Sequence, residues 1–168
     1  MNTALLVAAA RLASESVDVS IYTDLAELPP FNPDLDGDRT PVAVTSFRSQ
    51  LEACDAVLIS SPEYAHGVPG VLKNALDWVV SSSELVNKPI GVINASGRAT
   101  HAWMSLRDTL TVMSARLIAA ASITIPLEGR TLDATGIARD ARLSGALRSA
   151  IGALVFAVLE ARSSRRPA

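Results

Sequence analysis

The stretch from Asp55 to Val80 constrains the fold of this chain more than any other. Asp55–Ser60 is a short, mostly apolar run, which is typical of a strand buried on both faces of a parallel sheet. Ser61–Gly70 holds two prolines and two glycines, so it continues neither a strand nor a helix. Val71–Val80 then carries apolar residues at helical spacing. This order predicts an α/β protein whose ligand site lies in the loop, at the carboxyl end of the strand.

The rest of the chain alternates between helical and extended patterns without repeats. The expected helices are Thr3–Ala13 (with Asn2 as its cap), Pro41–Ala53, Val71–Val80, His101–Ala115 and Ile137–Ala161. The expected strands are Val17–Tyr22, Asp55–Ser60, Pro89–Asn94 and Leu117–Ile125. This alternation predicts one domain, residues 1–161, with a parallel sheet covered by helices on both faces. A basic tail, residues 162–168, is expected to fray.

The residues of the central loop and helix resemble a known family. Pro62-Glu63-Tyr64, followed by the run from Pro69 to Trp78 (PGVLKNALDW), resembles the signature of the NADPH-dependent FMN reductases. These are flavodoxin-like enzymes related to quinone, azo-dye and chromate reductases. The resemblance spans seventeen positions and includes Trp, Tyr, two Pro and Lys-Asn in register. The family usually has Asn where this chain has Ala65, and often a polar or aromatic residue at the position of His66.

The resemblance implies a bound FMN, NADPH or NADH as the hydride donor, and a small-molecule electron acceptor. It also implies which residues contact the flavin: Asn2, Pro62, Glu63, Tyr64, Ala65, His66, Ser96 and Gly97. Tyr64 would pack along the flavin ring, and Ser96 and Gly97 belong to a small-residue loop that allows close approach. No catalytic side chain is expected, because the flavin carries the chemistry. The resemblance further implies a homodimer that uses Val71–Val80 and His101–Ala115.

The start of the chain departs from the family pattern, which begins with a strand and a phosphate-binding loop. Here the resemblance starts at Asn2 and runs to about Ala161, so we expect about four strands, with the family's first strand missing. Either Val17–Tyr22 pairs with Asp55–Ser60, or a hole remains between them. A misassigned start and a true truncation both explain this pattern. The alternative to a reductase is therefore a truncated, non-enzymatic flavodoxin-like paralogue with impaired flavin binding; an electron carrier is a weaker rival.

Several polar side chains also have purely structural interpretations. Glu63 is expected to cap local backbone or pair with an arginine. Asn74 and Asp77 are expected to tie their helix to a loop or to shape a subunit contact, in preference to a catalytic role. Trp78 fits the core or a dimer interface better than a cofactor platform. Arg98 fits a nicotinamide phosphate contact and a solvated position equally well. His101, at a helix start, fits a structural role better than a catalytic one.

Composition excludes several other classes of protein. The net charge is −2 and basic residues are scattered, which argues against nucleic-acid binding. Two histidines and one cysteine at no ligand spacing predict no metal site. Cys54 is interpreted as a small buried residue in a reducing compartment, in preference to a reactive thiol. No leader peptide is evident, and Ile151–Leu159 is too short to span a bilayer, so a soluble cytoplasmic protein with no membrane contact is expected.

Overall fold

The computed structural model describes residues 1–127 and 131–164 and contains a three-stranded parallel sheet of order β1-β2-β3. The strands are β1 (Val57–Ser60), β2 (Pro89–Ile93) and β3 (Arg116–Leu117). Val57 pairs with Ile90, and Pro89 pairs with Arg116. Every residue of the central strand β2 is buried, which explains its uninterrupted apolar sequence. The predicted α/β class with a parallel sheet is confirmed.

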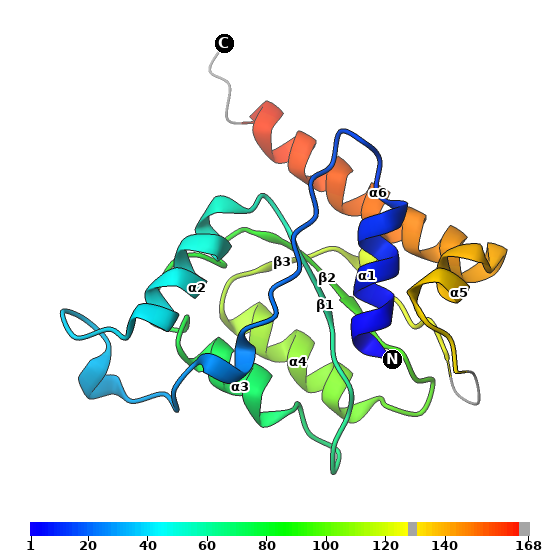
Figure 1. Cartoon of the computed structure of the whole chain (residues 1–168). Coiled ribbons are helices and arrows are strands. Elements are labelled where there is room, and N and C mark those ends of the chain that lie inside the picture. Colours follow the sequence, from blue (N-terminus) through cyan, green and yellow to red (C-terminus); the bar gives the residue numbers. More distant parts are fainter. Residues whose placement is uncertain (128–130, 165–168) are drawn as a thin grey trace.

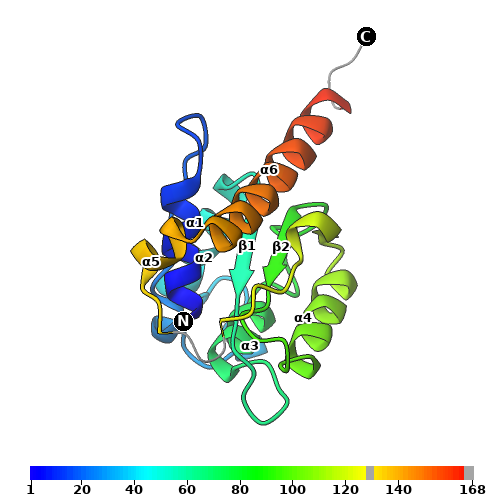
Figure 2. The same cartoon turned by 90° about the vertical axis from the view of Figure 1, so that its right-hand side faces the viewer.

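Helices cover both faces of this sheet (Figures 1 and 2). On one face lie α1 (Asn2–Leu12), α5 (Ala134–Arg139) and α6 (Ala141–Ser164). Buried residues of all three, among them Leu5, Ile137 and Leu147, pack in one cluster with Ile93. On the other face lie α2 (Val42–Ala53), α3 (Gly70–Asp77) and α4 (His101–Val112), which share a cluster with Ile90 and Val92. Short 3-10 helices at Leu25–Glu27, Pro33–Leu35 and Ala119–Ala121 complete the described elements. The first four predicted helices are thus confirmed to within a few residues.

Two predicted strands are wrong. Val17–Tyr22 forms no strand, and its residues 18–20 are exposed, so the apolar alternation of this segment buries little. It does not pair with β1, whose only strand neighbour in the described part of the chain is β2. Leu117–Ile125 keeps strand geometry only at its first residue, because Ala119–Ala121 turn into a 3-10 helix and a single bridge joins Asn94 to Thr124. The described sheet therefore has three strands instead of about four.

The predicted last helix is divided in two by aspartate caps. Asp133 Oδ1 accepts a hydrogen bond from Gly136 N at 2.7 Å and starts α5. Asp140 Oδ1 accepts from Leu143 N at 3.0 Å and starts α6. Helix α6 continues to Ser164, so residues 162–164 of the predicted tail are helical, and residues 165–168 lie outside the described residues.

Helix α6 also corrects an expectation about membranes. By length and composition alone it is long and apolar enough to cross a bilayer, which the shorter run Ile151–Leu159 is not. Core helices of soluble proteins pass the same test. Leu143, Leu147 and Leu154 of α6 are buried within the chain, whereas Phe156 and Leu159 are exposed. Length and hydropathy therefore do not decide between these two environments.

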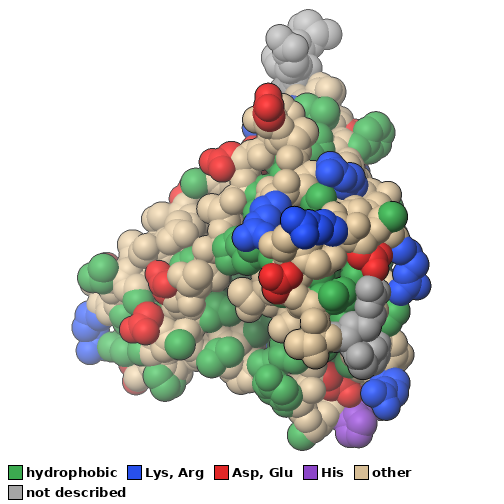
Figure 3. All heavy atoms as spheres, turned by 45° about the vertical axis from the view of Figure 1, so that its right-hand side comes forward, with side chains coloured by type: hydrophobic (Ala, Val, Ile, Leu, Met, Phe, Trp, Pro, Cys, Tyr) green, Lys and Arg blue, Asp and Glu red, His purple; other side chains and the backbone are tan. Residues whose placement is uncertain are grey.

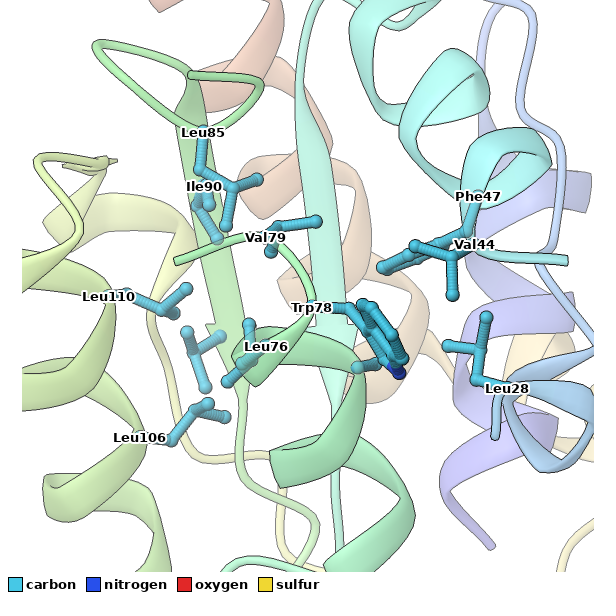
Figure 4. Packing of buried hydrophobic residues seen from close by; sticks show 12 residues of the cluster. Leu28, Val44, Phe47, Leu76, Trp78, Val79, Leu85, Ile90, Leu106 and Leu110 are labelled. Carbon is cyan, nitrogen blue, oxygen red and sulfur yellow. The ribbon is translucent and has the colours of Figure 1, made fainter. Parts of the chain in front are cut away.

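Trp78 anchors the larger core cluster (Figure 4). Its side chain is fully buried, points toward Leu28 and Val44, and donates from Nε1 to the Pro29 carbonyl oxygen at 2.7 Å. Asn74, one turn earlier on α3, donates from Nδ2 to the same oxygen at 3.0 Å, and its Oδ1 accepts from Phe31 N at 2.8 Å. The expected roles of Trp78 in the core and of Asn74 in tying α3 to a loop are confirmed.

We expect Gly91→Ala to destabilise the protein. A Cβ at Gly91 would lie 2.8 Å from both Ala121 Cβ and Ala121 O, and 3.0 Å from Leu58 Cδ1, so strand β2 and the 3-10 helix would have to separate. The expected loss in the free energy of unfolding is about 1–3 kcal/mol, measured by urea denaturation. Gly145→Ala is the matched control, because a Cβ there meets open space on α6 and should stabilise by up to about 1 kcal/mol. Equal effects at the two glycines would contradict this packing.

Candidate functional site

The loop that follows β1 is closed by a tight two-residue turn. Tyr64 N donates to Gly67 O at 3.1 Å, and Gly67 N donates to Tyr64 O at 2.9 Å. The two central residues, Ala65 and His66, have φ values of 49° and 60°. Turns of this kind favour glycine or asparagine at both positions, because a Cβ is crowded when φ is positive. Ala65 and His66 therefore have a strained backbone conformation, in a turn that follows the carboxyl end of β1.

Glu63 ties this loop to the start of α4. Its Oε2 accepts a hydrogen bond from Ala102 N at 2.8 Å, and its Oε1 lies 3.1 Å from His66 Nδ1. The Ala102 N–H group, with the His66 contact, holds the pKa of the Glu63 carboxyl below its usual value. The rings of His66 and His101 meet edge to face, with centroids 4.5 Å apart. Glu63 does bond a backbone N–H group, as expected, but that group belongs to Ala102 at the start of α4 and not to the local backbone, and the side-chain partner is a histidine instead of an arginine.

The loop that follows β2 is shaped by a buried asparagine. Asn94 donates from Nδ2 to Ala99 O at 2.8 Å, and its Oδ1 accepts from Ser96 N at 3.1 Å. Ser96 Oγ in turn accepts from Arg98 N at 3.3 Å. A small cavity of about 10 Å³ joins this loop to the first one, and it is lined in part by Pro62, Glu63, Asn94 and Ala99. The structure therefore brings the two predicted ligand loops together at one edge of the sheet.

The start of α1 reaches the same edge. Ser60, the last residue of β1, donates from Oγ to Asn2 Oδ1 at 2.8 Å. The first N–H groups of a helix have no partner within it, and they carry partial positive charge. Figures 1 and 2 show the N-terminus beside the end of β1 that leads into the first loop. Asn2 thus lies at the carboxyl edge of the sheet. Its expected role as the cap of the first helix is wrong, because Met1 is the N-cap residue and the Asn2 side chain bonds Ser60 instead.

The exposed groups at this edge are of the kinds that can bind a flat ring with polar oxygens. Among the described residues, the backbone N–H groups of Ala65, His66 and Gly97 donate no hydrogen bond within the chain, so they are available to ligand oxygens. The Tyr64 side chain is 68% exposed and offers a flat apolar face. The cavity between the loops holds no more than about one water, so a flat ring would have to lie over the loops instead of inside them. In the part of the chain that the structure describes, no cluster of side chains is arranged to hold a metal ion.

Together, the fold and this edge define an α/β protein with a nucleotide-type site on the loops after two adjacent parallel strands. The sequence profile of the family described as NADPH-dependent FMN reductase matches residues 1–128. The chain belongs to this family. The expected class, an NAD(P)H-dependent oxidoreductase that uses FMN, is thereby confirmed, and the family assignment does not favour the non-enzymatic alternative.

Relatives and solved structures agree with this assignment. The NAD(P)H-dependent FMN reductase of Pseudomonas aeruginosa is 33% identical over 144 residues, covering 79% of this chain and 77% of that protein. The NADPH:quinone oxidoreductase of Arabidopsis thaliana is 40% identical over 100 residues, covering 57% of this chain and 51% of that protein. This chain thus spans about half the length of that relative. The structure of the flavoenzyme FerB from Paracoccus denitrificans shares the fold, with a TM-score of 0.74 at 24% identity over 95% of this chain and 90% of FerB.

Other side chains have local structural roles. Asp77 pairs with Lys73 along α3 instead of reaching a loop. Cys54 donates from Sγ to Leu51 O at 3.2 Å, and burial raises the pKa of its thiol, which fits a structural residue better than a nucleophile. Sequence reasoning missed Asn94 as the residue that shapes the second loop, although a polar residue at the end of a buried strand was a usable signal. It also missed the contact between His66 and His101, which no local pattern reveals.

The lowered pKa of Glu63 predicts an acid-sensitive loop. A carboxyl whose pKa is lower in the folded state than in the unfolded state stabilises the protein above its unfolded value, near pH 4.3. That stabilisation is lost as the pH falls through the lower, folded pKa. We expect the stability of Glu63→Gln, measured by urea denaturation, to fall less steeply below about pH 4.5 than that of the wild type. Parallel pH profiles for the two proteins would show that Glu63 makes no such contribution.

Proposed function

We propose that this protein is an NAD(P)H-dependent flavin reductase that passes electrons from FMN to a quinone or a similar flat acceptor. One observation carries the proposal: the loops after β1 and β2 meet at one edge of the sheet. At this edge lie the exposed Tyr64 side chain and backbone N–H groups that have no partner among the described residues. All of these residues fall within the range that matches the family. The quinone oxidoreductases among the relatives support the acceptor class. Bound FMN supplies the hydride and electron chemistry.

The chain's own residues bind and orient the flavin in this proposal. Pro62, Glu63, Tyr64, Ala65 and His66 surround one edge of the ring, with Tyr64 along its face and the amides of Ala65 and His66 donating to its oxygens. These backbone contacts do not depend on the identity of residue 65, so alanine in place of the family's asparagine is compatible with the site.

The second loop and the first helix complete the proposed site. Ser96 and Gly97 allow the second loop to approach the ring closely. The start of α1, with Asn2 fixed by Ser60, receives the phosphate. The hydrogen bond between Ser60 and Asn2 fixes the start of α1 at this edge. The positive end of the dipole of α1 then attracts an anion there.

We also propose a soluble, cytoplasmic homodimer that has no membrane or nucleic-acid partner. Helices α3 and α4 expose large apolar side chains, among them Val71 at 52%, Met104 at 63% and Val112 at 86%. Such exposure on two neighbouring helices fits a contact between copies. Sedimentation of the purified protein tests this, since a monomer at micromolar concentration would contradict it.

The proposed activity is tested by NADPH oxidation. The purified protein, loaded with FMN, should oxidise NADPH faster when a soluble benzoquinone is present, with one quinone reduced per NADPH. The same assay with NADH measures the choice of donor. Absence of quinone-dependent NADPH oxidation by protein that retains bound FMN would contradict the proposed function.

A further inference from the structure

His66 occupies a backbone position that disfavours it. Its φ of 60° follows the φ of 49° at Ala65, and glycine adopts such values without strain, whereas other residues meet a cost of about 1–2 kcal/mol each. The paired hydrogen bonds between Tyr64 and Gly67 hold this conformation. Backbone strain that persists in a structure is a pointer to function. The imidazole is therefore presented at the site by a turn that would be more stable with glycine at this position.

The imidazole of His66 is oriented by a carboxylate. Glu63 Oε1 lies 3.1 Å from Nδ1, and Glu63 itself is fixed by Ala102 N at 2.8 Å. An ionised carboxylate only accepts hydrogen bonds, so Nδ1 carries a proton and Nε2 is the nitrogen left for other partners. The other titratable group that faces His66 is His101, whose ring lies edge to face 4.5 Å away.

The position of His66 suits a proton donor. Its side chain is 76% exposed, and Figure 3 shows histidine at the molecular surface of this end of the protein. The residue lies in the loop proposed to surround the flavin edge, where an acceptor would also stand. Imidazole is the side chain that most often acts as a general acid in enzymes, and solvent water can return a proton to an exposed ring.

We propose that His66 donates a proton to the quinone during its reduction, an inference that rests on the proposed function. A quinone takes up two electrons and two protons to become a hydroquinone. The hydride supplies both electrons and one proton and leaves a hydroquinone monoanion, while the reduced flavin is oxidised. The Nε2–H bond of the imidazolium breaks as the second O–H bond forms, and neutral His66 then regains a proton from water. Atoms and charges balance without a further reactant.

His66→Asn tests this role with the turn preserved. Asparagine tolerates positive φ, and its amide donates to Glu63, but it does not titrate. We expect reoxidation of the reduced enzyme by benzoquinone, followed by stopped flow at pH 7, to slow about 10²-fold, the lower end of the effect of a positioned acid. Ferricyanide accepts one electron and no proton, so its reduction should proceed at the wild-type rate. An equal loss with both acceptors, or no loss with benzoquinone, would overturn the proposal.

His101→Asn is the matched control, because His101 has no hydrogen bond to the Glu63 carboxylate among the described contacts. Its benzoquinone rate should stay within about twofold of wild type. If His101→Asn lowered the benzoquinone rate as much as His66→Asn does, the effect would not be specific to His66, and the proposal would be overturned.

NMR of the protein without FMN gives a readout that does not depend on turnover. The side-chain ¹⁵N signals of neutral His66 should place the proton on Nδ1 in the wild type, because Glu63 Oε1 lies beside that nitrogen, and this tautomer preference should weaken in Glu63→Ala. An unchanged tautomer preference in Glu63→Ala would contradict the orientation by Glu63. If NADPH did not reduce the FMN bound to the wild-type protein, the proposed function would be contradicted, and this inference would be contradicted with it. An active wild type matched by His66→Asn would contradict only the role of the histidine.

Discussion

Replacing Trp78 with alanine is expected to lower the free energy of unfolding by about 3–5 kcal/mol. The indole is fully buried, meets the Phe31 ring edge to face at 5.0 Å, and satisfies the Pro29 carbonyl oxygen. Alanine would leave a cavity between α3 and α2 and would release the segment around Pro29. Because small domains are stable by only about 5–15 kcal/mol in total, the loss should be visible as a large shift in urea denaturation followed by circular dichroism.

Trp78→Phe separates packing from hydrogen bonding. Phenylalanine keeps an aromatic ring in the core but removes the N–H group that donates to Pro29 O, for which we expect a smaller loss of about 1–3 kcal/mol. A loss below about 1 kcal/mol for Trp78→Ala would mean that this side chain is not the anchor of the cluster.

Replacing Tyr64 with alanine is expected to weaken FMN binding by about 1–3 kcal/mol, or roughly 5- to 150-fold in Kd. The reason is the loss of a flat aromatic surface along the flavin ring. Tyr64 is 68% exposed and its backbone closes the turn, so removing the side chain should leave the stability of the protein nearly unchanged. Fluorescence titration of FMN measures the change in affinity.

Tyr64→Phe keeps the ring and removes the hydroxyl, so its Kd for FMN should stay close to the wild-type value. Equal affinities for wild type, Tyr64→Phe and Tyr64→Ala would show that the tyrosine does not stack on the flavin. A large loss for Tyr64→Phe would point instead to a hydrogen bond from the hydroxyl.

The sequence predicted the elements that are stabilised by their own burial pattern. Strands β1 and β2 are continuous apolar runs between helices, and α1 to α4 have apolar faces at helical spacing. Each of these elements can therefore be predicted from its own residues alone. Val17–Tyr22 shows the limit of this reasoning. Its alternating pattern favours a strand, but a strand also needs a neighbour for its backbone, and none pairs with it in the described structure.

The expected strand Leu117–Ile125 failed for a local reason. Three consecutive alanines, residues 119–121, favour a helical turn, and Gly91 on β2 lets that turn approach closely enough for Ala121 to contact the strand. The break between α5 and α6 had a readable signal, since Asp133 and Asp140 are both good helix caps.

The candidate site was predicted in position but not in its contacts. The loop composition after β1 and β2 and the resemblance to a family pointed to these two loops. A structural role was expected for Glu63, but its partner at the start of α4 was not. The contact between His66 and His101 joins a loop to the start of α4, and the two residues are 35 positions apart in the chain, so only the folded backbone reveals it.

The most direct test of this account is an FMN titration of the purified protein, followed by flavin fluorescence. The account predicts saturable binding of one FMN per chain at micromolar or lower Kd, because the loops after β1 and β2 and the start of α1 supply donors at one edge. Absence of saturable binding by folded protein would contradict the site described here.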